Sequence, residues 1–363
     1  MYLYCDPKTT RWENGLECCL WDGVTCDNVT GNVIGLDLSF SCLQGTLRSD
    51  SSLFGLRHLQ SLNLGVNNFL TSPILPELSV FTELRHLNLT DSNFSGLVPT
   101  EISYLTKLVL LDLSVNFNGK TTIVPSLRIA NTDFKVLVQN LTELRVLKLD
   151  LVDMSAVSPS SFVNLSSSLT VFSASMCQLR GELLPNIFRF PNLLDLDLQV
   201  NDIMVSFPKS NWSKSVESLA LLDTSISGKI PDSISELKNL KILDLSNCKL
   251  IGSIPSSLAN LTELTRLDLS SNNFTGVLDF RVFSTLKNLQ VLSLTVELNL
   301  DYNNMNYIFP ELETLALSSC NLTQFPLFPK SSRKLRRLDL SKNKISGRIP
   351  RWFWDLGKDT IVS

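Results

Sequence analysis

The sequence predicts an α/β solenoid, a right-handed superhelix with a parallel, concave β-sheet, and three observations support this prediction. A Leu-x-x-Leu-x-Leu segment recurs along the whole chain of 363 residues. An Asn or a Cys follows most copies at a constant distance, and several copies lead into Gly-x-Ile-Pro. Self-similarity at a period of about 20 to 50 residues indicates stacked repeats that bury their apolar faces against one another.

Aligned on its final leucine, the repeat occurs thirteen times. The reference positions are 38, 64, 89, 113, 149, 174, 198, 221, 245, 269, 294, 317 and 340. Their spacing stays between 23 and 26 residues, apart from a 36-residue step between 113 and 149. Within each copy the leucines alternate with other residues, which is the period of a half-buried strand. Stacking such strands buries each leucine between neighbours, which contributes roughly 1.5 to 3 kcal/mol per side chain.

The third residue after the reference position is predicted to stabilise the end of each strand. Five repeats place an asparagine there: Asn67, Asn116, Asn201, Asn272 and Asn343. A buried amide can pair with backbone groups that lose their partners where the strand ends. The same position is held by Cys177, Cys248 and Cys320. These cysteines are expected to be structural residues of the repeat rather than metal ligands or disulfide partners.

The turn after the strand carries the Gly-x-Ile-Pro signature, at residues 96–99, 228–231, 252–255 and 347–350. Glycine permits the tight bend, and proline fixes φ where the return segment begins. The 36-residue step contains residues 119–125 and 133–138. This insertion either forms a protruding loop that takes part in recognition or lengthens the convex side.

The composition argues against several functions. The chain has 32 basic and 35 acidic residues, with no basic stripe that would follow a nucleic-acid backbone. Its apolar runs are far shorter than the roughly 18 to 20 residues that cross a bilayer. The two histidines, His58 and His86, lie in no pattern with a nucleophile, and the sequence has no Gly-rich phosphate loop. We therefore expect no catalysis, no cofactor, no metal and no nucleic-acid partner.

The cysteines and glycosylation sequons indicate an oxidising, secretory environment. Five of the eight cysteines fall early, at Cys5, Cys18, Cys19, Cys26 and Cys42, as in a disulfide-stabilised terminal module. The sequons, which are expected glycan acceptors, begin at Asn28, Asn88, Asn93, Asn140, Asn164, Asn211, Asn260, Asn273 and Asn321. Some can arise from repeat packing alone, because Asn-Leu-Thr recurs shortly before the strands.

The segment from Trp12 through Cys18-Cys19-Leu-Trp-Asp-Gly-Val-Thr-Cys26 to Ser39 closely resembles the amino-terminal cap of plant extracellular leucine-rich-repeat proteins. Together with the Leu-x-Gly-x-Ile-Pro repeats, it is similar to the ectodomain of plant receptor-like proteins of the disease-resistance type. The resemblance covers nearly the whole chain and includes residues 136–142 of the long step. It implies a disulfide between Cys19 and Cys26. Cys18 is left to pair with Cys5, with Cys42 or with nothing.

The repeats and the resemblance together predict the domain organisation. Residues 1–32 form a truncated cysteine-containing cap, residues 33–356 form about thirteen repeats with an insertion around 117–140, and residues 357–363 begin a further, truncated repeat. The chain is expected to be an amino-terminal fragment without the signal peptide and the membrane helix of its family. The full-length protein is expected at the extracellular side of the plasma membrane.

A ligand is expected to bind the solvent-facing positions of the concave sheet. Repeats that contain Leu-Asp-Leu-Ser, such as those of Asp37 and Asp268, present a structural row of polar residues and are set aside. Repeats five to eight depart from this pattern. The predicted ligand-binding residues are Lys148, Asp150, Ser173, Ser175, Met176, Gln178, Gln199, Val200, Leu222 and Asp223. Their mixed chemistry suits a peptide or a small protein, and sequence drift without function is the alternative.

These features favour a binding module over an enzyme. The predicted function is extracellular ligand recognition by a plant immune or developmental receptor, with a peptide, microbial or cell-wall-derived ligand on the concave face. The resemblance implies co-receptor leucine-rich-repeat kinases as signalling partners. One alternative is a secreted inhibitor of cell-wall-degrading enzymes, similar to polygalacturonase inhibitors, which have fewer repeats and a closing cysteine cap. The other alternative is the ectodomain of a receptor kinase.

Overall fold

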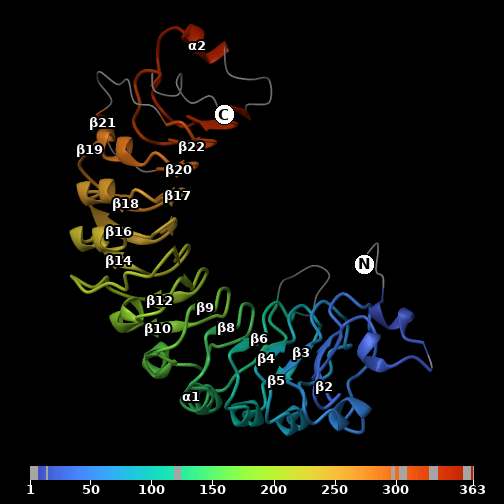
Figure 1. The fold of residues 1–363 in the computed structure, drawn as a ribbon. Helices are drawn as coiled ribbons and strands as arrows, with labels where there is room; N and C mark the ends of the chain where they lie inside the picture. The colour runs from blue at the N-terminus through green and yellow to red at the C-terminus, as the bar shows by residue number, and fades with distance from the viewer. Residues whose placement is uncertain are drawn as a thin grey trace. The chain divides into compact units, whose positions relative to one another are not determined.

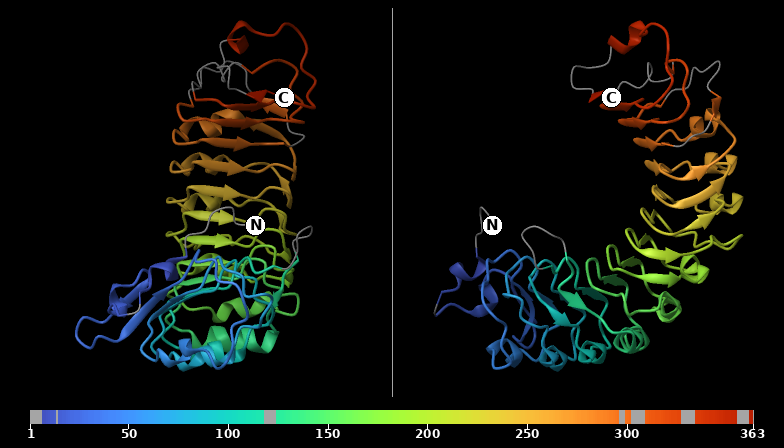
Figure 2. Two further views of the ribbon diagram at one scale, coloured as in Figure 1. Left: turned by 90° about the vertical axis from the view of Figure 1, so that its right-hand side faces the viewer. Right: turned by 180° about the vertical axis from the view of Figure 1, so that it is seen from behind.

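The computed structural model describes residues 7–13, 15–117, 124–295, 299–301, 309–326, 334–354 and 361–362. The chain consists of two compact units, Met1–Gly181 and Glu182–Ser363 (Figure 1). Each unit is a stack of repeats in which a short strand alternates with a return segment, as Figure 2 shows from two further sides. The predicted solenoid of leucine-rich repeats with parallel strands is confirmed.

In the first unit a parallel ladder of strands follows an antiparallel cap strand. The cap strand β1 (Val24–Cys26) pairs antiparallel with β2 (Val33–Asp37). The parallel ladder then runs through β3 (Ser61–Asn63), β4 (His86–Asn88), β6 (Leu110–Asp112), β8 (Val146–Lys148) and β9 (Val171–Ser173). At the flank, β5 (Gly96–Leu97) pairs with β7 (Leu127–Arg128). Equivalent residues of neighbouring repeats therefore lie side by side.

The second unit repeats this arrangement. Its ladder runs through β11 (Asp195–Asp197), β13 (Ser218–Ala220), β15 (Ile242–Asp244), β17 (Arg266–Asp268), β20 (Val291–Ser293), β22 (Thr314–Ala316), β23 (Arg337–Asp339) and β24 (Ile361–Val362). Shorter strands at the flank are β12 (Asp202–Met204), β14 (Ser227–Gly228), β16 (Lys249–Gly252), β18 (Asn273–Phe274), β19 (Val277–Asp279) and β21 (Asn299–Asp301). The remaining strand, β10, spans Arg180–Glu182.

The return segments are mainly 3₁₀-helices rather than α-helices. These are η1 (Lys8–Arg11), η2 (Cys18–Leu20), η3 (Ser52–Gly55), η4 (Pro76–Val80), η5 (Thr100–Tyr104), η6 (Pro159–Asn164), η7 (Pro185–Arg189), η8 (Asp232–Glu236), η9 (Ser256–Asn260) and η10 (Phe280–Thr285). The two α-helices of the described residues are α1 (Asn131–Asn140) and α2 (Arg351–Trp354). Segments of three to six residues barely offset the cost of starting an α-helix, so the tighter helix forms in nearly all of them, with the four-residue α2 as the exception among the described residues.

The core lies between the ladder and the return segments. All thirteen reference positions are buried, with at most 9% of each residue exposed. Phenylalanines fill the space towards the return segments, and in the first unit Phe134, Phe162 and Phe172 pack edge to face. Among the described residues no helix is long and apolar enough to span a membrane.

The asparagine after each strand binds backbone groups of two successive repeats. Asn116 Nδ2 donates to the carbonyls of Leu113 and Ser114 at 3.0 and 3.2 Å and to that of Leu89, one repeat back, at 2.9 Å. Its Oδ1 accepts the N–H groups of Ser92 and Phe94 at 3.1 and 3.0 Å. One buried side chain thus satisfies five backbone groups.

The three late cysteines take over part of this role. Cys177 Sγ donates to Leu149 O at 3.0 Å, and Cys248 Sγ donates to Leu221 O at 3.2 Å. Both acceptors are the carbonyls of the preceding reference position, as for asparagine. Cys320 is arranged in the same way, and all three cysteines are buried and form no disulfide. Burial raises the pKa of the Cys248 thiol. The prediction that these cysteines are structural is confirmed.

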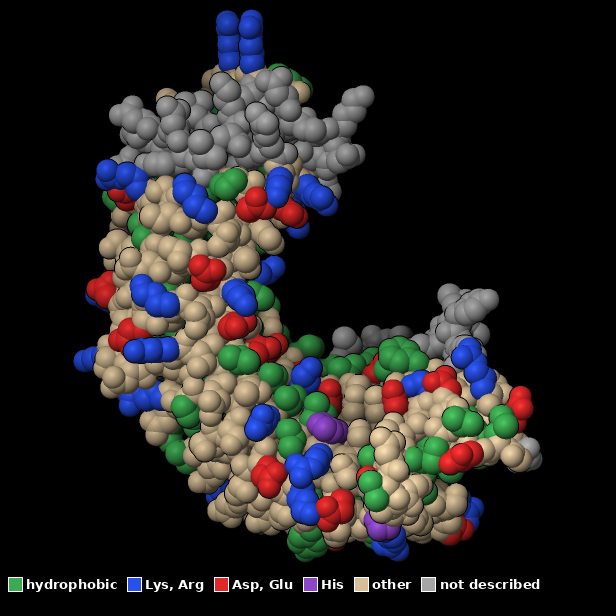
Figure 3. Space-filling model, viewed as in Figure 1, with side chains coloured by type: hydrophobic (Ala, Val, Ile, Leu, Met, Phe, Trp, Pro, Cys, Tyr) green, Lys and Arg blue, Asp and Glu red, His purple; other side chains and the backbone are tan. Residues whose placement is uncertain are grey.

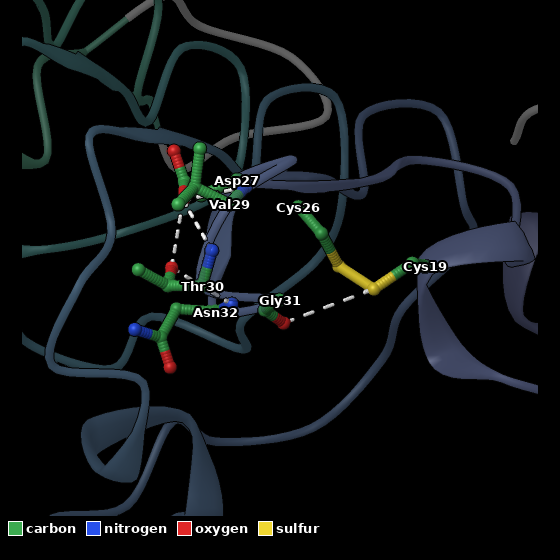
Figure 4. Close-up of a disulfide and its surroundings, with 7 residues drawn as sticks. All are labelled: Cys19, Cys26, Asp27, Val29, Thr30, Gly31 and Asn32. Atoms are coloured by element: carbon green, nitrogen blue, oxygen red, sulfur yellow. Dashed lines mark hydrogen bonds between the residues drawn. A yellow bond between two sulfur atoms is a disulfide. The ribbon is translucent and has the colours of Figure 1, made fainter.

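The cap is held by covalent and ionic contacts. Cys19 and Cys26 form a disulfide beside a turn in which Thr30 donates twice to Asp27 (Figure 4). Cys18 carries a free thiol, so of its three alternatives the structure has the unpaired one. The Cys18, Cys19 and Cys26 sulfurs lie within 4.8 Å of one another, but the disulfide removes two of them as metal ligands.

The remaining early cysteines and the first charged pair complete the cap. Cys42 is disulfide-bonded, and Cys5 lies outside the described residues. Lys8 Nζ lies 2.9 Å from Asp37 Oδ2, which ties η1 to the first repeat strand. Burial raises the pKa of Asp37, but hydrogen bonds from Ser39 and the Lys8 charge outweigh it, so the pKa lies below its usual value.

The long step between the fourth and fifth repeats forms a full α-helix. Phe134, Leu137 and Val138 of α1 are buried, and Thr100 Oγ1 donates to Asp133 Oδ1 at 2.8 Å from η5. Residues 133–138 therefore lengthen the return layer. The hypothesis of a protruding recognition loop is left with residues 119–125, of which 119–123 lie outside the described residues, and Pro125 bridges antiparallel to Phe117.

We predict that Asn116→Ala lowers the free energy of unfolding by about 3 kcal/mol, because five backbone groups lose their partner in the interior. Asn116→Cys should cost about half as much, since a thiol can still donate to the carbonyl of Leu89. Thermal unfolding followed by circular dichroism measures both variants. Equal losses for Ala and Cys would show that the hydrogen bonds of this side chain do not matter.

We also predict that Asp37 makes the cap sensitive to acid. Because its folded pKa lies below the unfolded value of about 3.9, its contribution is present above pH 4 and is lost as the pH falls through the folded pKa. The contribution stays under about 1 kcal/mol, since half of the carboxylate is exposed. Asp37→Asn should therefore lower Tm at pH 6 and match the wild type near pH 2. A Tm difference independent of pH would contradict this.

Candidate functional site: the strand face

The candidate site lies on the strand face, which is the side of the parallel sheet turned away from the return segments. The predicted residues divide between the units. The first unit contains Lys148, Asp150, Ser173, Ser175, Met176 and Gln178, and the second contains Gln199, Val200, Leu222 and Asp223. The two sets are described separately.

Five of the thirteen repeats carry a local Asp–Ser pair on this face. In the second unit, Asp244 Oδ1 accepts the N–H of Ser246 at 3.1 Å and its hydroxyl at 2.6 Å. Asp268 and Ser270 form the same pair. The carboxylate thereby holds the chain where it leaves the strand. This contact explains the recurring Leu-Asp-Leu-Ser without any ligand.

In the first unit the same contact is made between two repeats. Lys148 stands where other repeats have the aspartate, and Asp150 stands where they have the serine. Asp150 Oδ1 reaches into the next repeat and accepts the Ser175 N–H at 2.8 Å and the Ser173 hydroxyl at 2.5 Å. The aspartate–serine contact is therefore kept, but one repeat supplies the acceptor and the next repeat supplies both donors.

This contact between repeats shows that one predicted site residue is buried. Ser173 is only 8% exposed, because its hydroxyl is turned to Asp150 and its neighbours cover it. It does not offer a ligand a free polar group, contrary to the expectation from its strand position. Asp150 and Ser175 are half-buried and engaged in the same structural contact.

Other predicted residues remain accessible. In the first unit Met176 is 37% exposed, Gln178 is exposed and Lys148 is half-buried. In the second unit Val200 is 38% exposed and Leu222 is half-buried.

Two polar residues of the second unit are partly engaged within it. Gln199 donates from its backbone and its side chain to Asp197, at 3.0 and 2.9 Å. Asp223 Oδ1 accepts from Asn247 Nδ2 at 2.7 Å.

An apolar row on the strand face is missing from the sequence prediction. Leu110, Val146 and Val171 occupy equivalent places on β6, β8 and β9 and are direct neighbours in register. All three are half-buried, and Figure 3 shows hydrophobic side chains gathered over β6 and β8. The signal was available, because the third residue before the reference position is apolar in these three successive repeats and glycine or polar in the three before them.

A second apolar feature lies at the far end of the same strands. The residue two places after the reference position adopts a left-handed backbone in every repeat that the structure describes there. Asn, Asp and Gly suit this conformation, whereas a β-branched residue there is strained. Yet Val115 has φ of 60° and Met176 has φ of 55°. We call Leu110, Val146, Val171, Val115 and Met176 together the aliphatic rows.

The sequons differ in exposure. Asn28, Asn164, Asn211, Asn260 and Asn273 are exposed, and Asn88, Asn93, Asn140 and Asn321 are half-buried. Asn93 Nδ2 donates to Asn68 Oδ1 at 2.9 Å, and Asn88 on the strand face accepts from Thr90 N at 2.9 Å. Glycan occupancy stays a prediction at all nine.

Comparison with known proteins agrees with this architecture. The family model described as Leucine Rich Repeat matches residues 83–105, 239–261, 263–284 and 334–356. Receptor-like protein 6 of Arabidopsis thaliana is 43% identical over 241 residues, which are 66% of this chain and 24% of that protein. Further relatives from Arabidopsis thaliana and Solanum pimpinellifolium are also named receptor-like proteins. The chain spans about a quarter of the length of its first such relatives.

Solved structures share the fold over nearly the whole chain. The crystal structure of PEPR1–AtPEP1 has a TM-score of 0.70 and 27% identity, over 97% of this chain and 48% of that one. The ectodomain of the plant membrane receptor kinase GASSHO1/SCHENGEN3 from Arabidopsis thaliana, solved in complex with CASPARIAN STRIP INTEGRITY FACTOR 2, has a TM-score of 0.59 and 25% identity, over 96% and 49%.

The stacked strands, the buried asparagine and cysteine positions and the cysteine-containing cap define a leucine-rich-repeat solenoid. Within that class, the chain belongs to the plant receptor-like proteins.

We predict that Asp150→Ala lowers Tm by roughly 4 °C, because Ser175 N–H and the Ser173 hydroxyl lose a charged acceptor worth about 1.5 to 3 kcal/mol. The matched control is Lys148→Ala at the end of β8, two residues before Asp150, which should change Tm by less than about 1 °C, since Lys148 forms no ion pair with a described residue. If both substitutions behave alike, Asp150 has no structural role.

Proposed function

We propose that the chain is the ligand-recognition part of a plant cell-surface receptor that has no catalytic activity of its own. Its ligand is a peptide or small protein, of microbial, plant or cell-wall origin, which binds the strand face. The receptor is held in the plasma membrane by parts outside this chain and signals through partner leucine-rich-repeat kinases. Family membership and the similarity to a receptor-kinase ectodomain solved with a bound factor support this proposal.

The aliphatic rows of the first unit carry the proposal. A stable strand face needs only the short polar pairs that most repeats have. Here three successive strands instead place Leu110, Val146 and Val171 at the solvent boundary. Apolar side chains at an accessible surface gain free energy when a partner covers them, roughly 25 cal/mol for each Å² buried.

The charge distribution fits a protein or peptide better than a polyanion. Figure 3 shows both signs interspersed on the described surface that it presents. The ion pairs of the first unit, such as Lys107–Glu83 at 2.7 Å, neutralise basic residues locally. No steering field for nucleic acid or for an anionic polysaccharide results.

The test is a selection of random 12-residue peptides, displayed on phage, against the purified chain. Peptides enriched on the wild type should bind Met176→Glu and Val171→Glu at least tenfold more weakly. The matched control is Leu97→Glu, which changes an aliphatic residue that is 47% exposed at the flank of the same unit. Leu222→Glu tests whether the second unit also contributes.

Binding to the control variant should equal binding to the wild type, and the Tm of all variants should stay within about 2 °C. The proposal fails if no peptide is enriched, or if the enriched peptides bind the strand-face variants as well as the wild type. Loss of binding to Leu97→Glu alone would move the site to the flank.

A further inference from the structure

Lys148 is the one cation among the thirteen residues that directly precede the reference positions. The others are Asp, Asn, Ser or Ala. Its neighbour in register on β6 is Asp112, which accepts the N–H of Ser114 at 3.0 Å and its hydroxyl at 2.5 Å. Asp150, two residues on, accepts from Ser173 and Ser175. Both nearby carboxylates are thus engaged, and Lys148 forms no ion pair with any residue that the structure describes.

The aliphatic rows lie on both sides of this cation. Val146 precedes Lys148 by two residues on the same strand, with Leu110 and Val171 beside it on β6 and β9. Val115 and Met176 lie towards the other end of the neighbouring strands. Lys148 is half-buried as a residue, and a cation beside apolar side chains attracts an incoming carboxylate more strongly than one in open water.

The left-handed place after the strand offers a test of the aliphatic rows. Asparagine suits this conformation, as at Asn247 in the second unit, whereas a valine such as Val115 is strained there. Val66 has the same strain, so strain by itself does not mark a binding residue, but it makes a matched pair of substitutions available.

We propose that the first unit recognises an acidic, aliphatic peptide segment. A carboxylate of the ligand pairs with Lys148 Nζ, and aliphatic side chains on either side of that carboxylate cover the aliphatic rows. This inference rests on the proposed function, since it names the chemistry of the ligand for the same strand face.

The first experiment measures the coupling between Lys148 and the ligand's carboxylate. The best-binding peptide from the phage selection is synthesised in two forms, both with an amidated C-terminus. The carboxylate peptide keeps each Asp or Glu, and the amide peptide replaces each of them with the matching Asn or Gln. Isothermal titration gives Kd for the wild type and for Lys148→Gln. The carboxylate peptide should lose about tenfold in affinity with Lys148→Gln, and the amide peptide should bind both proteins equally. The tenfold loss should shrink at high salt.

The second experiment uses two chemically identical substitutions. Val115→Asn and Val66→Asn both replace a valine with left-handed φ, 60° and 57° respectively, and both residues are half-buried. Their effects on Tm should match within about 1 °C. Only Val115→Asn should weaken the carboxylate peptide, by about fivefold, because Val66 follows β3, which lies three strands away from the β8 strand of Lys148 along the ladder.

The outcomes separate this inference from the proposed function. Enriched peptides that need Met176 but are basic, aromatic or indifferent to Lys148→Gln would overturn the inference and leave the binding function standing. Equal loss of affinity with Val66→Asn and Val115→Asn would also overturn it, since the effect would then be one of general stability. If no peptide depends on the strand face, both proposals are wrong.

Discussion

The structure depends on how the backbone N–H and C=O groups find hydrogen-bond partners where the chain leaves each strand. Every repeat must turn out of the ladder, and at that point N–H and C=O groups become buried without ladder partners. Asn116 alone pairs with five such groups in two repeats. Because these bonds run from one repeat to the next, they fix the repeat spacing and the strand register together. The leucine core supplies the larger energy, but it is non-directional and does not set this geometry.

The repeats in which cysteine replaces the asparagine show which of these hydrogen bonds are kept. Cys177, Cys248 and Cys320 keep the donor to the carbonyl of the preceding reference position, and their thiols cannot accept as an amide does. Three of the repeats thus function with part of the network. Where a cysteine replaces the asparagine, the donation to the preceding repeat is therefore the bond that is kept, and the acceptor side of asparagine is a stabilising addition.

The periodic features could be predicted from the sequence, and the non-periodic ones could not. The leucine spacing and the residues that follow it determine the strands, the buried positions and the structural cysteines. Helix type in the return layer depends on segment length and packing, which leave only a weak trace in the sequence. Ser173 was predicted to be exposed from its strand parity, but its burial results from a contact with Asp150 of the neighbouring repeat. The row of Leu110, Val146 and Val171 was detectable, but only by comparing one position across successive repeats.

In such an array a ligand can be recognised only by positions that the core and the turns leave free to vary. The interior positions are fixed by the core and by the turn, so they carry no information about a ligand. On the strand face, the Asp–Ser pair uses two more positions in five of the thirteen repeats. The first unit frees one of them by moving the carboxylate to Asp150, which serves the next repeat and leaves Lys148 uncompensated. The structural contact is preserved while a cation is placed between apolar side chains, and the binding surface that we propose for the first unit rests on this separation of the two roles.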